Sequence, residues 1–82
     1  HRVVVRFSLQ VADRVRERVW HRSQVEKECK DGSLELTLRV DNLDEVERWV
    51  LGWGAHVEVI APAELIARVR AAADGVRKLY RS

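Results

Sequence analysis

Apolar and polar residues alternate along the first nine positions of the chain. The odd positions from Val3 to Leu9 are apolar, whereas Arg6 and Ser8 fall on the other side of an extended segment. A period of two residues is typical of a β-strand with one buried face. We therefore expect the stretch RVVVRFSLQ, residues 2–10, to form the first strand.

The period changes at residue 11, where apolar residues begin to recur one helical turn apart, at Val11, Val15 and Val19. This spacing predicts an amphipathic helix over residues 11–20, with Val19 in the core and Trp20 at its border. His21 would then follow the last turn together with Arg22, where cations favour the negative end of the helix dipole.

Residues 23–40 read as a hairpin. Asp31-Gly32 predicts a two-residue type I′ turn, because both central positions of that turn need positive φ. The second arm alternates strictly, with its inward side formed by Leu34, Leu36, Leu38 and Val40. The first arm places Val25 and Cys29 inward with Lys27 between them, and an inward lysine is typical of an edge strand.

Residues 41–54 predict a second helix, with Asp41 or Asn42 as its N-cap and Gly54 as the left-handed residue that ends it. Its apolar face consists of Leu43, Val46, Trp49, Val50 and Trp53. A short strand follows over residues 55–61, and a last helix runs from Pro62 to about Tyr80. The apolar face of that helix must cover the rest of the core, pack across the end of the sheet, or pair with another chain.

The expected order is strand, helix, strand, strand, helix, strand, helix. This predicts an α+β fold of the ferredoxin-like βαββαβ type, with a four-stranded antiparallel sheet, two helices on one face and an extra C-terminal helix. A length of 82 residues fits one domain. Because the chain starts at His1 and has no methionine, we expect it to be a fragment of a longer protein.

Composition excludes several classes of function. The apolar runs are far shorter than the roughly 20 residues that span a bilayer, so we expect no membrane partner. A single cysteine, Cys29, forms no internal disulfide, which favours a reducing cytoplasm. The three histidines lack ligand spacing, and neither a glycine-rich phosphate loop nor a nucleophile motif is present. We therefore expect no enzymatic activity, no metal and no cofactor.

Two functions of the ferredoxin-like topology also fit poorly. RNA-recognition domains stack bases on aromatic residues of the central strands, and the outward positions of the predicted first and third strands hold no aromatic residue. Acylphosphatase-like enzymes bind phosphate in a glycine-rich loop after the first strand, and the stretch SLQVADR has no glycine.

Arginine and tryptophan supply the candidate binding residues. Arginine suits phosphates and carboxylates, so the candidate effector or nucleic-acid contacts near the end of the first helix are Arg14, Arg18, His21 and Arg22. The candidate interface residues on the two later helices are Trp49, Trp53, Arg70, Arg77 and Arg81. For the arginines the alternative is a solvated helix border, and for the tryptophans it is core packing.

Four segments carry a resemblance to a known family: WHRSQ at 20–24, DGS at 31–33, VERWVLGWGAHVEVIAP at 46–62 and ELIARVRAA at 64–72. In this order and spacing the chain resembles, over nearly its whole length, the C-terminal extension (WCX) domain of WYL-domain-containing bacterial transcriptional regulators. The W-V-L-G-W-G stretch is the most specific part.

The resemblance implies a non-catalytic regulatory and dimerisation module that contributes to effector sensing in the cytoplasm. Its partners would be the regulator's own winged helix-turn-helix and WYL domains, a second copy in a homodimer, and DNA through the absent helix-turn-helix domain. The effector would be a nucleic acid or a nucleotide-like ligand. Two alternatives stay open: a small-molecule-binding regulatory domain of the ACT type, and direct nucleic-acid binding through the arginine patches.

Overall fold

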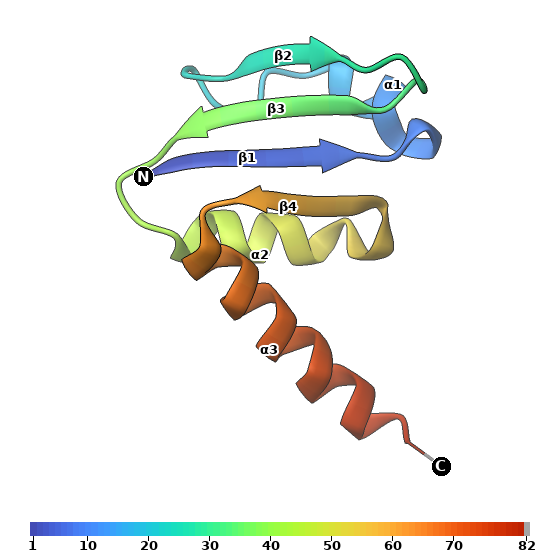
Figure 1. Ribbon diagram of the computed structural model, residues 1–82, viewed down its shortest axis with the longest axis vertical. Helices are drawn as coiled ribbons and strands as arrows, with labels where there is room; N and C mark the ends of the chain where they lie inside the picture. Colours follow the sequence, from blue (N-terminus) through green and yellow to red (C-terminus); the bar gives the residue numbers. More distant parts are fainter. Residues whose placement is uncertain (82) are drawn as a thin grey trace.

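The computed structural model describes residues 1–81. Its elements, in chain order, are β1 (Arg2–Phe7), α1 (Leu9–Arg16), β2 (Val25–Glu28), β3 (Leu34–Arg39), α2 (Asp44–Gly52), the 3-10 turn η1 (Gly54–His56), β4 (Val57–Ala61) and α3 (Ala63–Leu79). The strands form one antiparallel sheet in the order β2-β3-β1-β4 (Figure 1). This confirms the predicted βαββαβ arrangement with an added C-terminal helix.

The core lies between the sheet and the two helices α1 and α2. The central pair of strands contributes alternate residues, with Val3 opposite Leu38 and Val5 opposite Leu36. The helices add a buried stripe to the same cluster, formed by Val11, Ala12, Val15, Val46 and Val50. Each fully buried Val or Leu side chain stabilises the fold by about 1.5–3 kcal/mol relative to exposure. The alternation predicted for β3 is confirmed. In β1 it holds at Val3, Val5 and Phe7, but Val4 on the opposite face is also buried.

The first helix begins and ends earlier than the pattern predicts. Leu9 opens α1 instead of ending the strand, and its side chain is exposed. The placement of Val19 in the core is also wrong, because Val19 lies beyond the last helical residue, Arg16, and is 79% exposed. Trp20, the next residue, packs against the core in its place.

The hairpin turn has three residues, so the prediction of a two-residue type I′ turn is wrong. The N–H of Cys29 donates to the carbonyl oxygen of Ser33 at 2.9 Å, which leaves residues 30–32 as the loop. Positive φ occurs at Gly32, with a value of 89°, and at no non-glycine residue of the described chain. Asp31 keeps a negative φ, and its carboxylate accepts hydrogen bonds from the N–H and the hydroxyl of Ser33 at 3.0 and 2.6 Å.

β2 is an edge strand, as predicted, but all of its residues are exposed. Val25 does not face the core and is 64% exposed, because α1 ends too early to cover this strand. Cys29, the other residue expected inside, is partly buried. An ion pair ties the strand to the helix instead, with Glu28 Oε1 2.8 Å from Nε of Arg16.

The apolar face of the second helix follows its prediction, but the predicted N-cap is wrong, because the N-cap is Leu43 and neither Asp41 nor Asn42. The side chain of Asn42, one residue earlier, accepts a hydrogen bond from the N–H of Asp44 at 3.0 Å. Gly54 has the expected left-handed conformation, with φ at 62°. Trp49 and Trp53 are half-buried and pack against the core.

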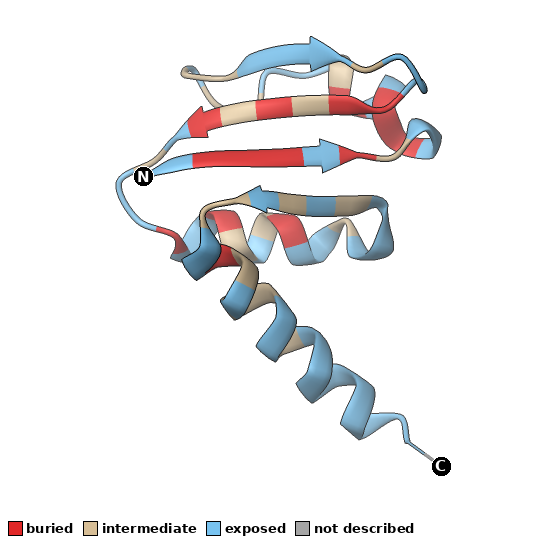
Figure 2. Cartoon of the chain, in the orientation of Figure 1, coloured by how far each residue is buried: buried red, intermediate tan, exposed pale blue. Residues whose placement is uncertain are grey.

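The last helix, α3, is anchored by its first half only. Leu65 is fully buried and Val69 packs partly against the core. The last turns project away from the sheet and are exposed (Figure 2). Leu79 is 79% exposed, and Tyr80, which follows the helix, is 83% exposed. Three roles were open for this helix: to cover the core, to pack across the end of the sheet, or to pair with another chain. In the described chain its first half covers the core.

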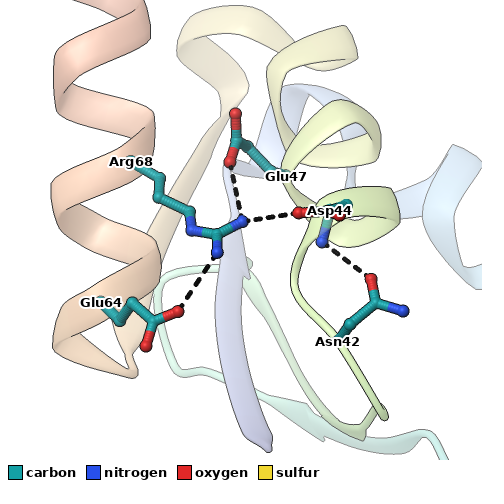
Figure 3. A network of polar contacts seen from close by, with 5 residues as sticks. All are labelled: Asn42, Asp44, Glu47, Glu64 and Arg68. Carbon is teal, nitrogen blue, oxygen red and sulfur yellow. Dashed lines mark hydrogen bonds and ion pairs between the residues drawn. The ribbon is translucent and has the colours of Figure 1, made fainter.

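A network of charges joins α3 to α2 (Figure 3). Arg68 Nη1 lies 2.8 Å from the carboxylate of Asp44 and 3.5 Å from that of Glu47. Arg68 Nη2 lies 3.4 Å from Glu64, one turn earlier on α3. The hydrogen bond to Asp44, supported by the other carboxylates, raises the pKa of Arg68 above its ordinary value. The network fixes the direction in which α3 leaves the domain.

Candidate functional site

The segment that links α1 to β2 has a defined structure held by Gln24. The side-chain oxygen of Gln24 accepts hydrogen bonds from the N–H of Trp20 at 2.7 Å and of His21 at 3.2 Å. The backbone N–H of Gln24 donates to the carbonyl oxygen of His21 at 3.0 Å. The side-chain amide of Gln24 thus accepts from two backbone N–H groups that would donate to backbone carbonyls in a helix or a sheet.

Trp20 closes the end of the first helix. Its indole Nε1 donates a hydrogen bond to the carbonyl oxygen of Val15, in the last turn of α1, at 2.9 Å, and the N–H of Arg18 donates to the same oxygen at 3.4 Å. The prediction that His21 and Arg22 lie at these last carbonyls is therefore wrong. Arg18 packs over the same indole, with its guanidinium carbon 4.7 Å from the ring centroid, as a cation–π contact.

His21 connects this segment to the end of β3 through Ser23. The backbone N–H of Ser23 donates to Nδ1 of His21 at 3.1 Å, so Nδ1 is an acceptor and the neutral ring carries its proton on Nε2. The hydroxyl of Ser23 accepts a hydrogen bond from the N–H of Arg39 at 2.9 Å. The imidazole therefore keeps one donor available.

The three tryptophans of the chain meet Phe7 in one aromatic cluster. Trp49 and Trp53 lie edge-on to Phe7, at centroid distances of 5.5 and 5.3 Å. Trp20 contacts both, at 5.8 and 5.7 Å. Edge-to-face pairs add to the stability gained by burial alone. Nε1 of Trp49 is buried and has no hydrogen-bond partner within residues 1–81.

A groove with two chambers, here called the Trp20 groove, lies beside this cluster. The first chamber, of about 240 Å³, is mainly apolar and is lined by Trp20, His21, Leu38, Val40, Glu45, Val46 and Trp49. The second, of about 400 Å³, is more polar and is lined by His21, Arg22, Ser23, Arg39, Val40, Asp41, Asn42, Glu45 and Val46. Because four residues line both chambers, the groove runs from an apolar end to a charged end.

The structure brings some of the predicted contact residues together and separates others. His21 and Arg22 line the groove, and Arg18 lies against the indole that forms its wall. Arg14 is exposed on α1 and lines neither chamber. Their role in effector binding stays a prediction.

The candidate interface residues divide in the same way. Trp49 and Trp53 belong to the aromatic cluster and are half-buried. Arg70, Arg77 and Arg81 are exposed along α3 and just after it. Among them Arg77 has a neighbour of opposite charge, Asp74, at 3.4 Å.

Sequence reasoning missed the other charged residues of the groove. Glu45 lies in the first turn of α2, where an acidic residue suits the positive end of the helix dipole, and Asp41 and Asn42 were predicted only as caps. Arg39 is the last residue of β3 and is exposed. The sequence does show a cluster of polar residues where β3 leads into α2. In the fold this cluster lies beside the segment that links α1 to β2.

A second polar hollow lies at the opposite end of the sheet. Ser8 Oγ and His56 Nδ1 are 3.2 Å apart in it, and Arg6 and Asp31 line its walls. The hydrogen bonds from Ser33 hold the pKa of Asp31 below its ordinary value. Across residues 1–81, the structure has no cluster of His, Cys, Asp and Glu that fits a metal ion, and no helix with the length and apolarity of a membrane span.

Similarity to known proteins identifies the family of the chain. No curated protein matches this sequence. The family model described as the WCX domain matches residues 1–76, which is nearly the whole chain and includes every strand as well as α1 and α2. The resemblance in the WHRSQ and WVLGWG stretches is thereby confirmed, and the chain belongs to the WCX domain family.

Proposed function

We propose that this chain is the C-terminal regulatory module of a WYL-domain-containing, DNA-binding transcriptional regulator, and that it helps the regulator to assemble and to respond to its effector. Membership of the WCX family is consistent with a regulatory C-terminal module, and this is not a known family of enzymes. In this role the module works in the cytoplasm, where the regulator meets its DNA.

The observation that carries the assembly role is the exposed second half of α3. Val76 and Leu79 lie near the end of α3, Tyr80 follows it directly, and all three side chains are exposed. A single-helix extension is marginal in water without tertiary packing, and grouped apolar residues on a surface mark an interaction site. A second copy of the module is the partner we propose, because the same helix from each copy forms a self-complementary interface about a two-fold axis.

Replacing one exposed leucine tests the assembly role. We expect the wild-type chain to sediment as a dimer at about 100 µM, and Leu79→Glu to sediment as a monomer with an unchanged circular dichroism spectrum. Leu9→Glu is the matched control, because Leu9 is also exposed but lies on α1. A wild-type chain that is monomeric at high concentration and does not bind its WYL domain would rule out the assembly role.

The arginines near Trp20 support a second element of the function, contact with a nucleic-acid effector. Arg18 and Arg22 lie on the segment that links α1 to β2, and Arg14 is exposed on α1. Phosphate contacts would make binding of single-stranded DNA weaken steeply with salt. The triple replacement of these arginines by glutamine should weaken binding and flatten the salt dependence. Unchanged affinity in the triple variant would exclude this patch.

A further inference from the structure

We propose that the Trp20 groove binds an apolar or aromatic α-amino acid, with the side chain in the first chamber and the charged ends between Glu45 and the arginines of the second. This inference goes beyond the proposed assembly and nucleic-acid roles and names a small ligand for the module itself. The lining of the groove and the pattern of its charges point to this ligand.

The first chamber has the size and the walls for one apolar side chain. Trp20, Leu38 and Val46 form its apolar lining. Its volume is about 240 Å³, which leaves room for a leucine or phenylalanine side chain. Apolar surface that leaves water here provides the driving force for binding.

The charges of the groove match a zwitterion. Glu45 lines both chambers, and Arg22 and Arg39 line the second. Among residues 1–81, none of these three forms an ion pair with another side chain. A carboxylate is complementary to an α-ammonium group, and an arginine is complementary to an α-carboxylate.

The mixture of signs also argues against ligands with one charge. A simple amine would leave the two guanidinium groups without a counterpart. A simple carboxylate would leave Glu45 without a counterpart. An α-amino acid satisfies both signs.

Calorimetry with four ligands tests the proposal. We expect L-phenylalanine and L-leucine to bind the chain with Kd values of about 1 mM or lower. Phenethylamine lacks the carboxylate and 3-phenylpropionate lacks the ammonium group, so each should bind at least about tenfold more weakly than phenylalanine. The indole N–H resonance of Trp49 should shift on titration with phenylalanine.

Charge-removing variants locate the site. Glu45→Gln, Arg22→Gln and Arg39→Gln should each weaken phenylalanine binding about tenfold. Glu17→Gln and Arg48→Gln are matched controls, because both residues are exposed and line neither chamber. The controls should bind as the wild-type chain does.

Three results would overturn the proposal. They are no heat with either amino acid up to about 10 mM, unchanged binding in the groove variants, and equal binding of phenylalanine and N-acetylphenylalanine amide. The last result would show that the groove takes an uncharged peptide-like group. Each of these leaves the sedimentation of wild type and Leu79→Glu unaffected, so failure of this inference is distinguishable from failure of the assembly role.

Discussion

The indole N–H of Trp20 donates to the carbonyl oxygen of Val15 across 2.9 Å, and Val15 is fully buried. This bond ends α1 and fixes the ring against Trp49 and Trp53. One side chain therefore caps a helix and forms a wall of the groove, so the stability of the fold and the shape of the candidate site depend on each other.

Trp20→Phe should cost about 0.5–1.5 kcal/mol of unfolding free energy, because the carbonyl oxygen of Val15 loses its 2.9 Å hydrogen bond from the indole and keeps only backbone donors such as the N–H of Arg18 at 3.4 Å. Urea denaturation followed by circular dichroism measures this loss. Trp53→Phe is the control, because it removes an indole from the same cluster and keeps the bond to Val15. Equal losses in the two variants would show that the cap contributes nothing beyond packing.

Gln24→Leu should loosen the linking segment, because the N–H groups of Trp20 and His21 lose their shared acceptor. We expect a loss of about 1 kcal/mol in stability and faster hydrogen exchange at both amides. Gln10→Leu serves as the control on an exposed position of α1. Unchanged exchange at Trp20 and His21 would contradict the role given to Gln24.

Arg68→Met should lower the midpoint of urea unfolding slightly at low salt, because the network with Asp44, Glu47 and Glu64 is lost. The effect should shrink as salt is added, since Arg68 is partly exposed and salt screens such pairs. Arg70→Met, at an exposed position on the same helix, should change stability little at either salt concentration. A loss that is independent of salt would assign the effect to packing of the side-chain stem.

Part of the acid sensitivity of the fold should come from Asp31. The hydrogen bonds from Ser33 lower its pKa in the folded chain, so its ionised form adds stability above the unfolded pKa of about 3.9. This contribution disappears as the pH falls through the lower folded value. Asp31→Asn and Ser33→Ala should both reduce the difference in urea midpoint between pH 7 and pH 3. An unchanged difference in both variants would remove Asp31 as a cause.

Deleting residues 76–82 should change the stability of the monomer, measured in dilute solution where the chain does not dimerise, by no more than about 0.5 kcal/mol, because the apolar side chains at the end of α3 are exposed. Leu65→Ala, in the anchored half, should cost about 2–5 kcal/mol, since Leu65 is fully buried. Thermal unfolding of the two variants compares the halves of the helix. A large loss on deletion would mean that the tip packs against its own domain.

The sequence predicts the sheet and the apolar faces of the helices because these features are periodic. The leucines of β3 and the Val46–Val50 stripe of α2 are examples. The end of α1 was mispredicted because Val19 continues the helical spacing of Val11 and Val15. What ends the helix is a side-chain contact from Trp20 and a turn held by Gln24, and neither follows a period.

The candidate site was predictable only in part for a related reason. His21 and Arg22 attract attention as a cluster of polar chemistry next to a tryptophan. Glu45 comes more than twenty positions later and has a sufficient local explanation at the start of a helix. The groove exists because the sheet brings the end of β3 beside the linking segment, and such a non-local contact has no signature in the spacing of residues.

All three tryptophans lie in one cluster with Phe7, whereas the only tyrosine, Tyr80, lies at the exposed end of α3. The intrinsic fluorescence of the chain is therefore divided in space, with indole emission arising beside the groove and phenol emission at the tip of the projecting helix. A single unlabelled sample thus carries two optical reporters. Ligand entry into the groove would change the first, and contact between two helix tips would change the second.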